Sequence, residues 1–138
     1  MSIVQTQTTS FKKELYEAVH NLSTNTLKIA LYTGNASLNE DTTVYTTLNE
    51  VVASGYTAGG NTLTGVAISS SGYTAYVNWA NTSWTAALTA RCALIYNVTQ
   101  GNKSIAVIDF GAEKTSTTTF TITMPANTAT TALIRSSN

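Results

Sequence analysis

Six short runs rich in apolar and β-branched residues follow one another along the second half of the chain, and brief polar turns separate them. The runs are 61–69, 72–80, 86–97, 103–110, 118–124 and 131–136. Runs of this length between turn residues are typical of β-strands. The 27 threonines of the sequence add to this tendency, because β-branched side chains favour pleated strands. The pattern predicts a mainly β protein, an antiparallel β-sandwich or jelly-roll-like fold.

The first half of the chain contains one helix-like and one strand-like pattern. Phe11, Leu15, Val19 and Leu22 recur at helical spacing after Ser10, which can serve as an N-cap, and they predict an amphipathic helix over about 11–22. The run "LKIALYT" that follows alternates in a way that predicts a strand with one buried face.

Two segments have little periodicity. Residues 1–9 are polar, and we expect a flexible or partner-bound N-terminal arm, or alternatively a first edge strand. Residues 34–60 form a long excursion with a possible helical turn near 46–52. No linker or repeat divides the sequence, so a single β-rich domain over 1–138 is expected.

The charge balance excludes some partners. Seven acidic residues balance seven basic ones, and charged residues make up 10% of the chain against about 25% in ordinary soluble domains. Without clustered Lys and Arg the chain has little attraction for nucleic acid or an anionic membrane, so neither is expected as a partner. The N-terminus does not resemble a signal peptide and no apolar run matches a membrane span, which favours a protein assembled in a cytoplasm.

The glycine-rich stretch "GYTAGGNT" invites comparison with a phosphate-binding loop. It has neither the lysine of the Walker type nor the G-x-G-x-x-G spacing of dinucleotide-binding folds. Gly59 and Gly60 are better explained by a tight turn that leads into a strand at Asn61, where glycine supplies the positive φ.

The residues with reactive side chains do not form an evident active site. His20, the only histidine, is expected on the exposed face of the helix, and Cys92, the only cysteine, is expected to be buried and inert. Glu40, Asp41 and Glu113 are the remaining candidates, either for a calcium site or for an acid pair of the kind that cleaves glycosidic bonds, but adjacent acids in a loop more often point apart. We therefore expect no catalytic residue, no metal and no cofactor.

Aromatic residues gather in the segment "GYTAYVNWANTSWT". Packing in the core is the favoured role for Tyr73, Tyr76, Trp79 and Trp84. Trp and Tyr side chains at a surface could instead anchor a partner or stack on a sugar, the latter role falling to Trp79 or Trp84. The candidate partner contacts of the whole chain are Ile3, Val4, Tyr56, Tyr76 and Trp84.

Seven stretches, taken in order, resemble a family of small virion structural proteins of tailed bacteriophages and prophages. They are "TSFKKELYEAVHNL", "TLKIALYT", "YTTLNEV", "GYTAGGNTLTG", "ARCALIYN", "IAVIDFGAEKT" and "TALIR", and they span almost the whole chain. The chain departs from the family pattern at Cys92, where a small residue is usual, and in the tail "SSN".

The resemblance implies a non-enzymatic component of the virus particle, assembled in the host bacterial cytoplasm. The leading expectation is a capsid decoration or cement protein that binds the major capsid protein, bridges capsomers and forms a homo-oligomer on the particle. A tail, neck or fibre-associated component that binds tail proteins is the structural alternative. A carbohydrate-binding module that uses Trp79 or Trp84 is the alternative from another class.

Overall fold

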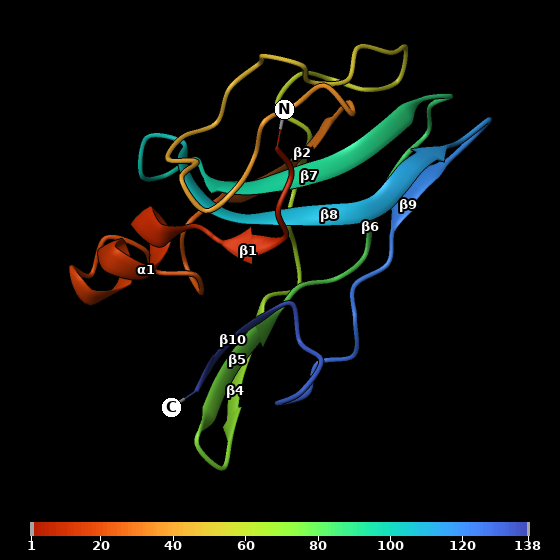
Figure 1. Cartoon of the computed structure of the whole chain (residues 1–138). Coiled ribbons are helices and arrows are strands. Elements are labelled where there is room, and N and C mark those ends of the chain that lie inside the picture. Colours follow the sequence, from red (N-terminus) through yellow and green to blue (C-terminus); the bar gives the residue numbers. More distant parts are fainter. Residues whose placement is uncertain (1, 138) are drawn as a thin grey trace.

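The computed structural model describes residues 2–137. Within them lie one helix and ten strands, which Figure 1 labels along the chain. The elements are β1 (Thr6–Gln7), α1 (Thr9–Tyr16), β2 (Leu27–Tyr32), β3 (Asn61–Thr62), β4 (Ala67–Ser71), β5 (Thr74–Asn78), β6 (Thr82–Trp84), β7 (Thr89–Asn97), β8 (Lys103–Thr115), β9 (Phe120–Ile122) and β10 (Ile134–Ser137).

The strands form three antiparallel sheets. The largest has the order β1-β8-β7-β2-β3, the second has the order β10-β5-β4, and β6 pairs with β9 in a two-stranded sheet. In Figure 1 the sheet of β10, β5 and β4 projects below the large sheet, with α1 beside it. The prediction of a mainly β, sandwich-like fold with one N-terminal helix is confirmed.

The strand predictions are mostly confirmed, with differences at several turns. Residues 111–115 were predicted as part of a turn, but they continue β8, whose Lys114 and Thr115 pair with β7. β4 likewise continues to Ser71, through residues predicted as a turn. The predicted run 61–69 is two strands, β3 and β4, because Gly65 takes a φ of +65° between them. The sequence 81–83, which looked like a turn, begins β6, and β6 pairs with β9 in register from Thr82 opposite Ile122 to Trp84 opposite Phe120. This pairing joins segments far apart in sequence, which local propensity does not reveal.

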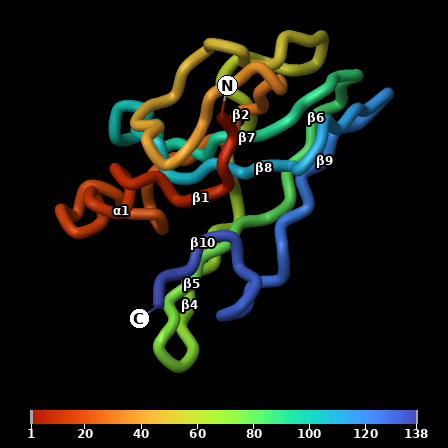
Figure 2. Tube along the Cα trace, in the orientation of Figure 1, coloured from red at the N-terminus to blue at the C-terminus, as the bar shows by residue number. Residues whose placement is uncertain are grey.

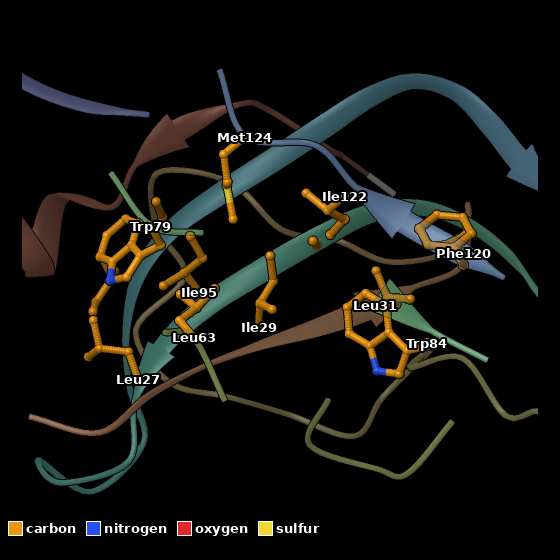
Figure 3. Packing of buried hydrophobic residues seen from close by; sticks show 14 of the residues in the cluster. Leu27, Ile29, Leu31, Leu63, Trp79, Trp84, Ile95, Phe120, Ile122 and Met124 are labelled. Carbon is orange, nitrogen blue, oxygen red and sulfur yellow. The ribbon is translucent and has the colours of Figure 1, made fainter. Parts of the chain in front are cut away.

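The main core lies against one face of β2. Figure 3 shows Leu27, Ile29 and Leu31 of this strand packed with both tryptophans and with side chains of β9. The prediction of a single buried face on β2 is wrong, since Ala30 and Tyr32 on the opposite face are also fully buried. They belong to a second cluster that the segment 34–60 covers, as Ala36 and Leu38 show.

The helix is shorter than predicted and begins earlier. α1 spans Thr9–Tyr16 instead of 11–22, and Thr8, not Ser10, is its N-cap, with the Thr8 hydroxyl accepting from the Phe11 N–H. The helix ends because Ala18 has a φ of +59°. The Val19 N–H then donates to the Glu14 carbonyl, and the Ala18 N–H donates to the Leu15 carbonyl. These two bonds form the Schellman motif, a common end of a helix at a left-handed residue.

Residues 2–9 are not a free arm. Ile3 forms a parallel bridge with Leu38, and β1 pairs with β8, which confirms the alternative of a first edge strand. Thr8 is fully buried and Thr9 already belongs to α1. Met1 lies outside the described residues. Removing 2–9 would therefore remove a strand and a helix cap.

The long segment 34–60 crosses the large sheet and contains no helix among its residues. Near 46–52 it has one hydrogen-bonded turn, in which the Glu50 N–H donates to the Thr47 carbonyl, but the φ of +62° at Asn49 keeps this turn from being helical. It is the orange to yellow-green tube at the top of Figure 2. Its middle part is tied to strands by the bridge between Tyr32 and Glu50 and by the bridge between Val44 and Lys103. The segment thus serves as a cover over one face of β2 and β7.

Candidate interaction surface

A groove of about 800 Å³ runs between α1 and the sheet of β10, β5 and β4. It is large enough for a ligand or a peptide segment. One wall is the helix and the turn that follows it, and the other is a face of the sheet. Its apolar lining comes mainly from Phe11, Leu15, Leu22, Ile68, Val77 and Ile134.

The strand register explains the apolar wall on the sheet. Val77 of β5 lies opposite Ile68 on one side and opposite Ile134 on the other. Residues directly opposite each other in antiparallel strands point to the same face. The three side chains therefore form one continuous row, which is buried at Val77 and Ile134 and 55% exposed at Ile68.

The helical wall is built by residues spaced three or four apart. Phe11 is fully buried and anchors the helix on the core. Leu15, one turn later, is 40% exposed at the groove, and Tyr16 is 94% exposed. Soluble proteins rarely leave several large apolar side chains together in water, and such patches mark interaction sites. The mouth of the groove is thus an apolar surface that lacks a cover.

His20 supports this wall from inside, which corrects the expectation of an exposed histidine. Its Nε2 lies 2.9 Å from Glu14 Oε1, its Nδ1 lies 3.0 Å from Asn97 Nδ2, and its ring lies against Phe11 with centroids 5.2 Å apart. The helix ends before residue 20, so the left-handed turn swings His20 inward. Helical spacing placed it on the wrong face.

The hydrogen bonds around His20 fix its tautomer. The Asn21 backbone N–H donates to Asn25 Oδ1, which identifies that atom as the acceptor oxygen of the Asn25 amide. The atom of Asn97 that lies 2.9 Å from this oxygen is therefore the donor, Nδ2. The same Nδ2 also lies against His20 Nδ1. Because an amide NH₂ group only donates, Nδ1 is the acceptor and carries no hydrogen. Nε2 carries the hydrogen and donates to Glu14. The chain of bonds joins the turn after α1 to the end of β7.

The predicted partner contacts separate into two groups. Val4 is 41% exposed, and Ile3 and Tyr76 are partly exposed, with Tyr76 in the lining of the groove. Tyr56 and Trp84 are buried, with exposed fractions of 8% and 4%. Their rings lie against each other, with centroids 5.9 Å apart. They form part of the core in this conformation and are not on the surface. Of the aromatic residues gathered in "GYTAYVNWANTSWT", the two tryptophans are buried in the core, whereas Tyr73 is 90% exposed and Tyr76 is partly exposed.

Trp79 is also buried, so neither tryptophan is positioned to stack on a sugar. Figure 3 shows both indole rings among the aliphatic side chains of the core. The favoured interpretation of the tryptophans as core residues is confirmed, and the sugar-binding role assigned to Trp79 or Trp84 does not fit their burial.

A second polar cluster, which the sequence did not reveal, surrounds Glu50. Its Oε1 accepts from the Tyr45 hydroxyl at 2.6 Å, and its Oε2 accepts from the Tyr56 hydroxyl at 2.6 Å and from the Gly59 N–H at 2.8 Å. The Tyr96 hydroxyl donates to the Gly59 carbonyl at 2.6 Å. A buried carboxylate with three donors is satisfied, so the cluster fastens the segment 34–60 internally.

The tyrosines of this cluster are poor acids. Burial raises the pKa of Tyr32, Tyr45 and Tyr56 well above the usual value, and the negative charge of Glu50 adds to each shift. Burial, with a smaller contribution from Glu50, raises the pKa of Tyr96 to about 12. The four hydroxyls therefore stay protonated at neutral pH and act as hydrogen-bond donors.

The remaining candidate residues are placed as follows. Gly59 and Gly60 have φ values of +100° and +79° and lead into β3 at Asn61, which confirms the turn. Cys92 is fully buried in β7, as predicted, and burial raises the pKa of its thiol to about 11. Within residues 2–137 no group of three or more His, Cys, Asp and Glu side chains gathers as a metal site would.

No protein-family model, curated protein or solved structure matches this chain. In the part of the chain that the structure describes, no helix has the length and apolar character needed to cross a membrane.

Proposed function

We propose that this protein is a non-enzymatic structural component of a tailed-phage particle, and that it docks on the outer capsid shell and bridges neighbouring capsomers. The virion as its place and the major capsid protein as its partner rest on the resemblance of seven ordered sequence stretches to small virion proteins. The observation that carries the docking role is the uncovered apolar groove between α1 and the sheet of β10, β5 and β4.

The groove suits adhesion to a protein surface. Leu15, Tyr16 and Ile68 stand at or beside its mouth with 40%, 94% and 55% of their surface in water. Full burial of an exposed large apolar side chain contributes about 1.5–3 kcal/mol, and a side chain that is already half buried gains about half of that. The helix that carries Leu15 and Tyr16 is fixed by the buried Phe11 and by the bonds of His20, and β4, which carries Ile68, is paired with β5. Little ordering therefore has to occur on binding.

The low charge of the chain also suits a crowded shell. The formal net charge is zero, and charged residues are few. Copies that sit side by side then repel one another little. A shell that must resist internal pressure gains stability from each additional contact between its subunits.

The first test counts copies of this chain per purified virion by quantitative mass spectrometry, with the major capsid protein as the internal standard. A shell protein repeats with icosahedral symmetry, so copies on the order of hundreds are expected. About a dozen copies or fewer would place the protein at the tail or neck and refute the shell role. Absence from the virion would refute the whole proposal.

The second test asks whether the groove is the docking surface. We expect Tyr16→Ser to weaken binding of the protein to shells that lack it by about tenfold, since it removes most of an exposed aromatic side chain. Tyr73→Ser is the matched control, because Tyr73 is 90% exposed at the turn between β4 and β5 and does not line the groove. Equal losses for both variants would show that docking uses another surface.

A further inference from the structure

The outer edge of β4 is open. Among residues 2–137, β4 pairs with β5 alone and on one side, and all five of its residues, Ala67–Ser71, are exposed. Natural proteins usually protect such edges with charged side chains, proline or a bulge. β4 has none of these protections: its sequence is AISSS, and its pairing with β5 is regular throughout. An edge of this kind is a template for another strand.

The hairpin turn determines which backbone groups point outward. Ser71 and Thr74 flank a two-residue turn, Gly72 and Tyr73, with Gly72 at a φ of +58°, so they form a hydrogen-bonded pair. Hydrogen-bonded pairs alternate along the ladder. The backbone groups of Ala67, Ser69 and Ser71 therefore face β5. Those of Ile68 and Ser70 face the open edge.

The opposite edge of the same sheet is covered. Hydrogen-bonded pairs also alternate between β5 and β10. The backbone N–H and C=O of Arg135 therefore face away from β5. The Arg135 carbonyl accepts from the side-chain amide of Gln7 at 2.9 Å, so β1 lies against this edge. A head-to-tail assembly of β4 on β10 would have to displace that contact. A symmetric contact of β4 with itself requires no such change.

We infer that β4 pairs antiparallel with β4 of a second copy of this chain, about a two-fold axis that passes through Ser69. This register sets Ile68 of each copy opposite Ser70 of the other. Both residues have their backbone groups on the open edge, so four hydrogen bonds form and every outward group of these residues is used. The two three-stranded sheets become one six-stranded sheet with the order β10-β5-β4-β4-β5-β10.

The side chains are compatible with this register. Ile68 lies opposite a serine of the second copy, so two large residues do not clash across the new pair, and its side chain stays on the face of the groove. Ser69 faces Ser69 across the axis, at the closer spacing of a pair without backbone bonds, where small side chains fit. The strand carries no charge, so two copies do not repel.

The pairing does not depend on the proposed function, because it concerns two copies of this chain and requires no shell. Its test uses the purified full chain alone. Failure of the pairing would leave the copy number in virions unaffected, and a wrong function would leave the mass of the purified protein unaffected.

The experiment measures mass by sedimentation equilibrium over a range of concentrations. The unaltered chain is expected to reach twice its 14.6 kDa monomer mass. Ser69→Lys sets two positive charges opposite each other, and Ser69→Glu sets two negative charges, so each alone is expected to weaken dimerisation by about tenfold or more. Ser54→Lys, at an exposed serine of the segment 34–60, adds the same charge and is expected to leave the dimer unchanged.

Mixing the two charge variants tests the register itself. Because Ser69 faces its own copy, a mixture of Ser69→Lys and Ser69→Glu is expected to recover the dimer as a heterodimer. A monomeric unaltered chain, a mass above the dimer, or a dimer that Ser69→Lys does not weaken would each overturn the inference. Failure of the mixture to recover would overturn the register, and circular dichroism confirms that every variant is folded.

Discussion

The Glu50 carboxylate accepts a hydrogen bond from the Tyr56 hydroxyl at 2.6 Å, and that hydroxyl oxygen in turn accepts from the Leu31 N–H at 2.9 Å. Two residues of the long segment 34–60 are thereby attached to the buried strand β2. The segment has no helix of its own, and it is held by this relay together with the bridges at Leu38, Val44 and Glu50. A polar cluster stabilises what would otherwise be a mobile loop.

Glu50→Gln is expected to destabilise the protein by about 1–3 kcal/mol. The carboxylate accepts three hydrogen bonds, whereas an amide has one acceptor oxygen and would direct its NH₂ group at other donors. The free energy of unfolding in urea measures the effect. Glu40→Gln, at an exposed position, is the matched control and is expected to change nothing; equal effects would contradict the role of the cluster.

Stability is expected to fall as the pH rises above about 10, the ordinary pKa of tyrosine. The pKa values of Tyr32, Tyr45, Tyr56 and Tyr96 are raised in the folded state, chiefly by burial. The unfolded chain then loses these protons at lower pH than the folded chain. The stability that the protonated tyrosines contribute is fully present below about pH 10 and is lost as the pH rises towards their pKa values in the folded state.

Urea unfolding at a series of alkaline pH values measures this slope, and phenolate absorbance recorded in parallel shows when ionisation occurs. Tyr96→Phe removes one ionising group and is expected to make the slope shallower, although it also loses the bond to the Gly59 carbonyl. A free energy of unfolding that stays constant to pH 12 would contradict the assignment.

Gly60→Ala is expected to cost about 2–5 kcal/mol, from the left-handed conformation together with a steric clash. A Cβ at this position would lie 1.8 Å from the Ile29 carbonyl oxygen of the buried strand β2. Gly72→Ala separates the two causes, since its φ is also positive but a Cβ there meets no atom within 4 Å. It is expected to cost about 1–2 kcal/mol. Thermal or urea unfolding measures the stability of both variants. Equal losses of stability would contradict the prediction.

Cys92 is expected to resist thiol reagents in the folded protein. It is fully buried in β7, and burial raises the pKa of its thiol to about 11, so few thiolates exist at pH 8. Labelling with a chromogenic disulfide is expected to proceed at the rate of unfolding and to become rapid in urea. Rapid labelling of the native chain would show that β7 opens readily at this point.

Local sequence patterns were sufficient for most of the strands. The alternation of Leu27, Ile29 and Leu31 and the glycines at 59 and 60 express constraints within a few residues, namely the period of a strand and the φ of a turn. The mainly β class and the buried thiol followed from the same kind of information. These features could be predicted because neighbouring residues alone decide them.

Other features depend on partners far along the chain. The helix was predicted as far as residue 22 on periodicity, but Ala18 ends it and His20 turns inward to meet Asn97, 77 residues away. Glu50 looked like one acid among seven until the fold surrounded it with tyrosines. The groove is likewise made by α1 and by β10, elements from opposite ends of the sequence.

The sequence by itself therefore determined the strand content, the turn at Gly59 and Gly60 and the neutral charge, because each is a property of local composition or spacing. Only the tertiary structure decided which aromatic residues are buried, which face of the N-terminal helix is covered, and which strand edge stays open. Burial and edge pairing depend on which distant segments meet. That outcome reflects the packing of the whole chain, to which a short stretch contributes only one surface.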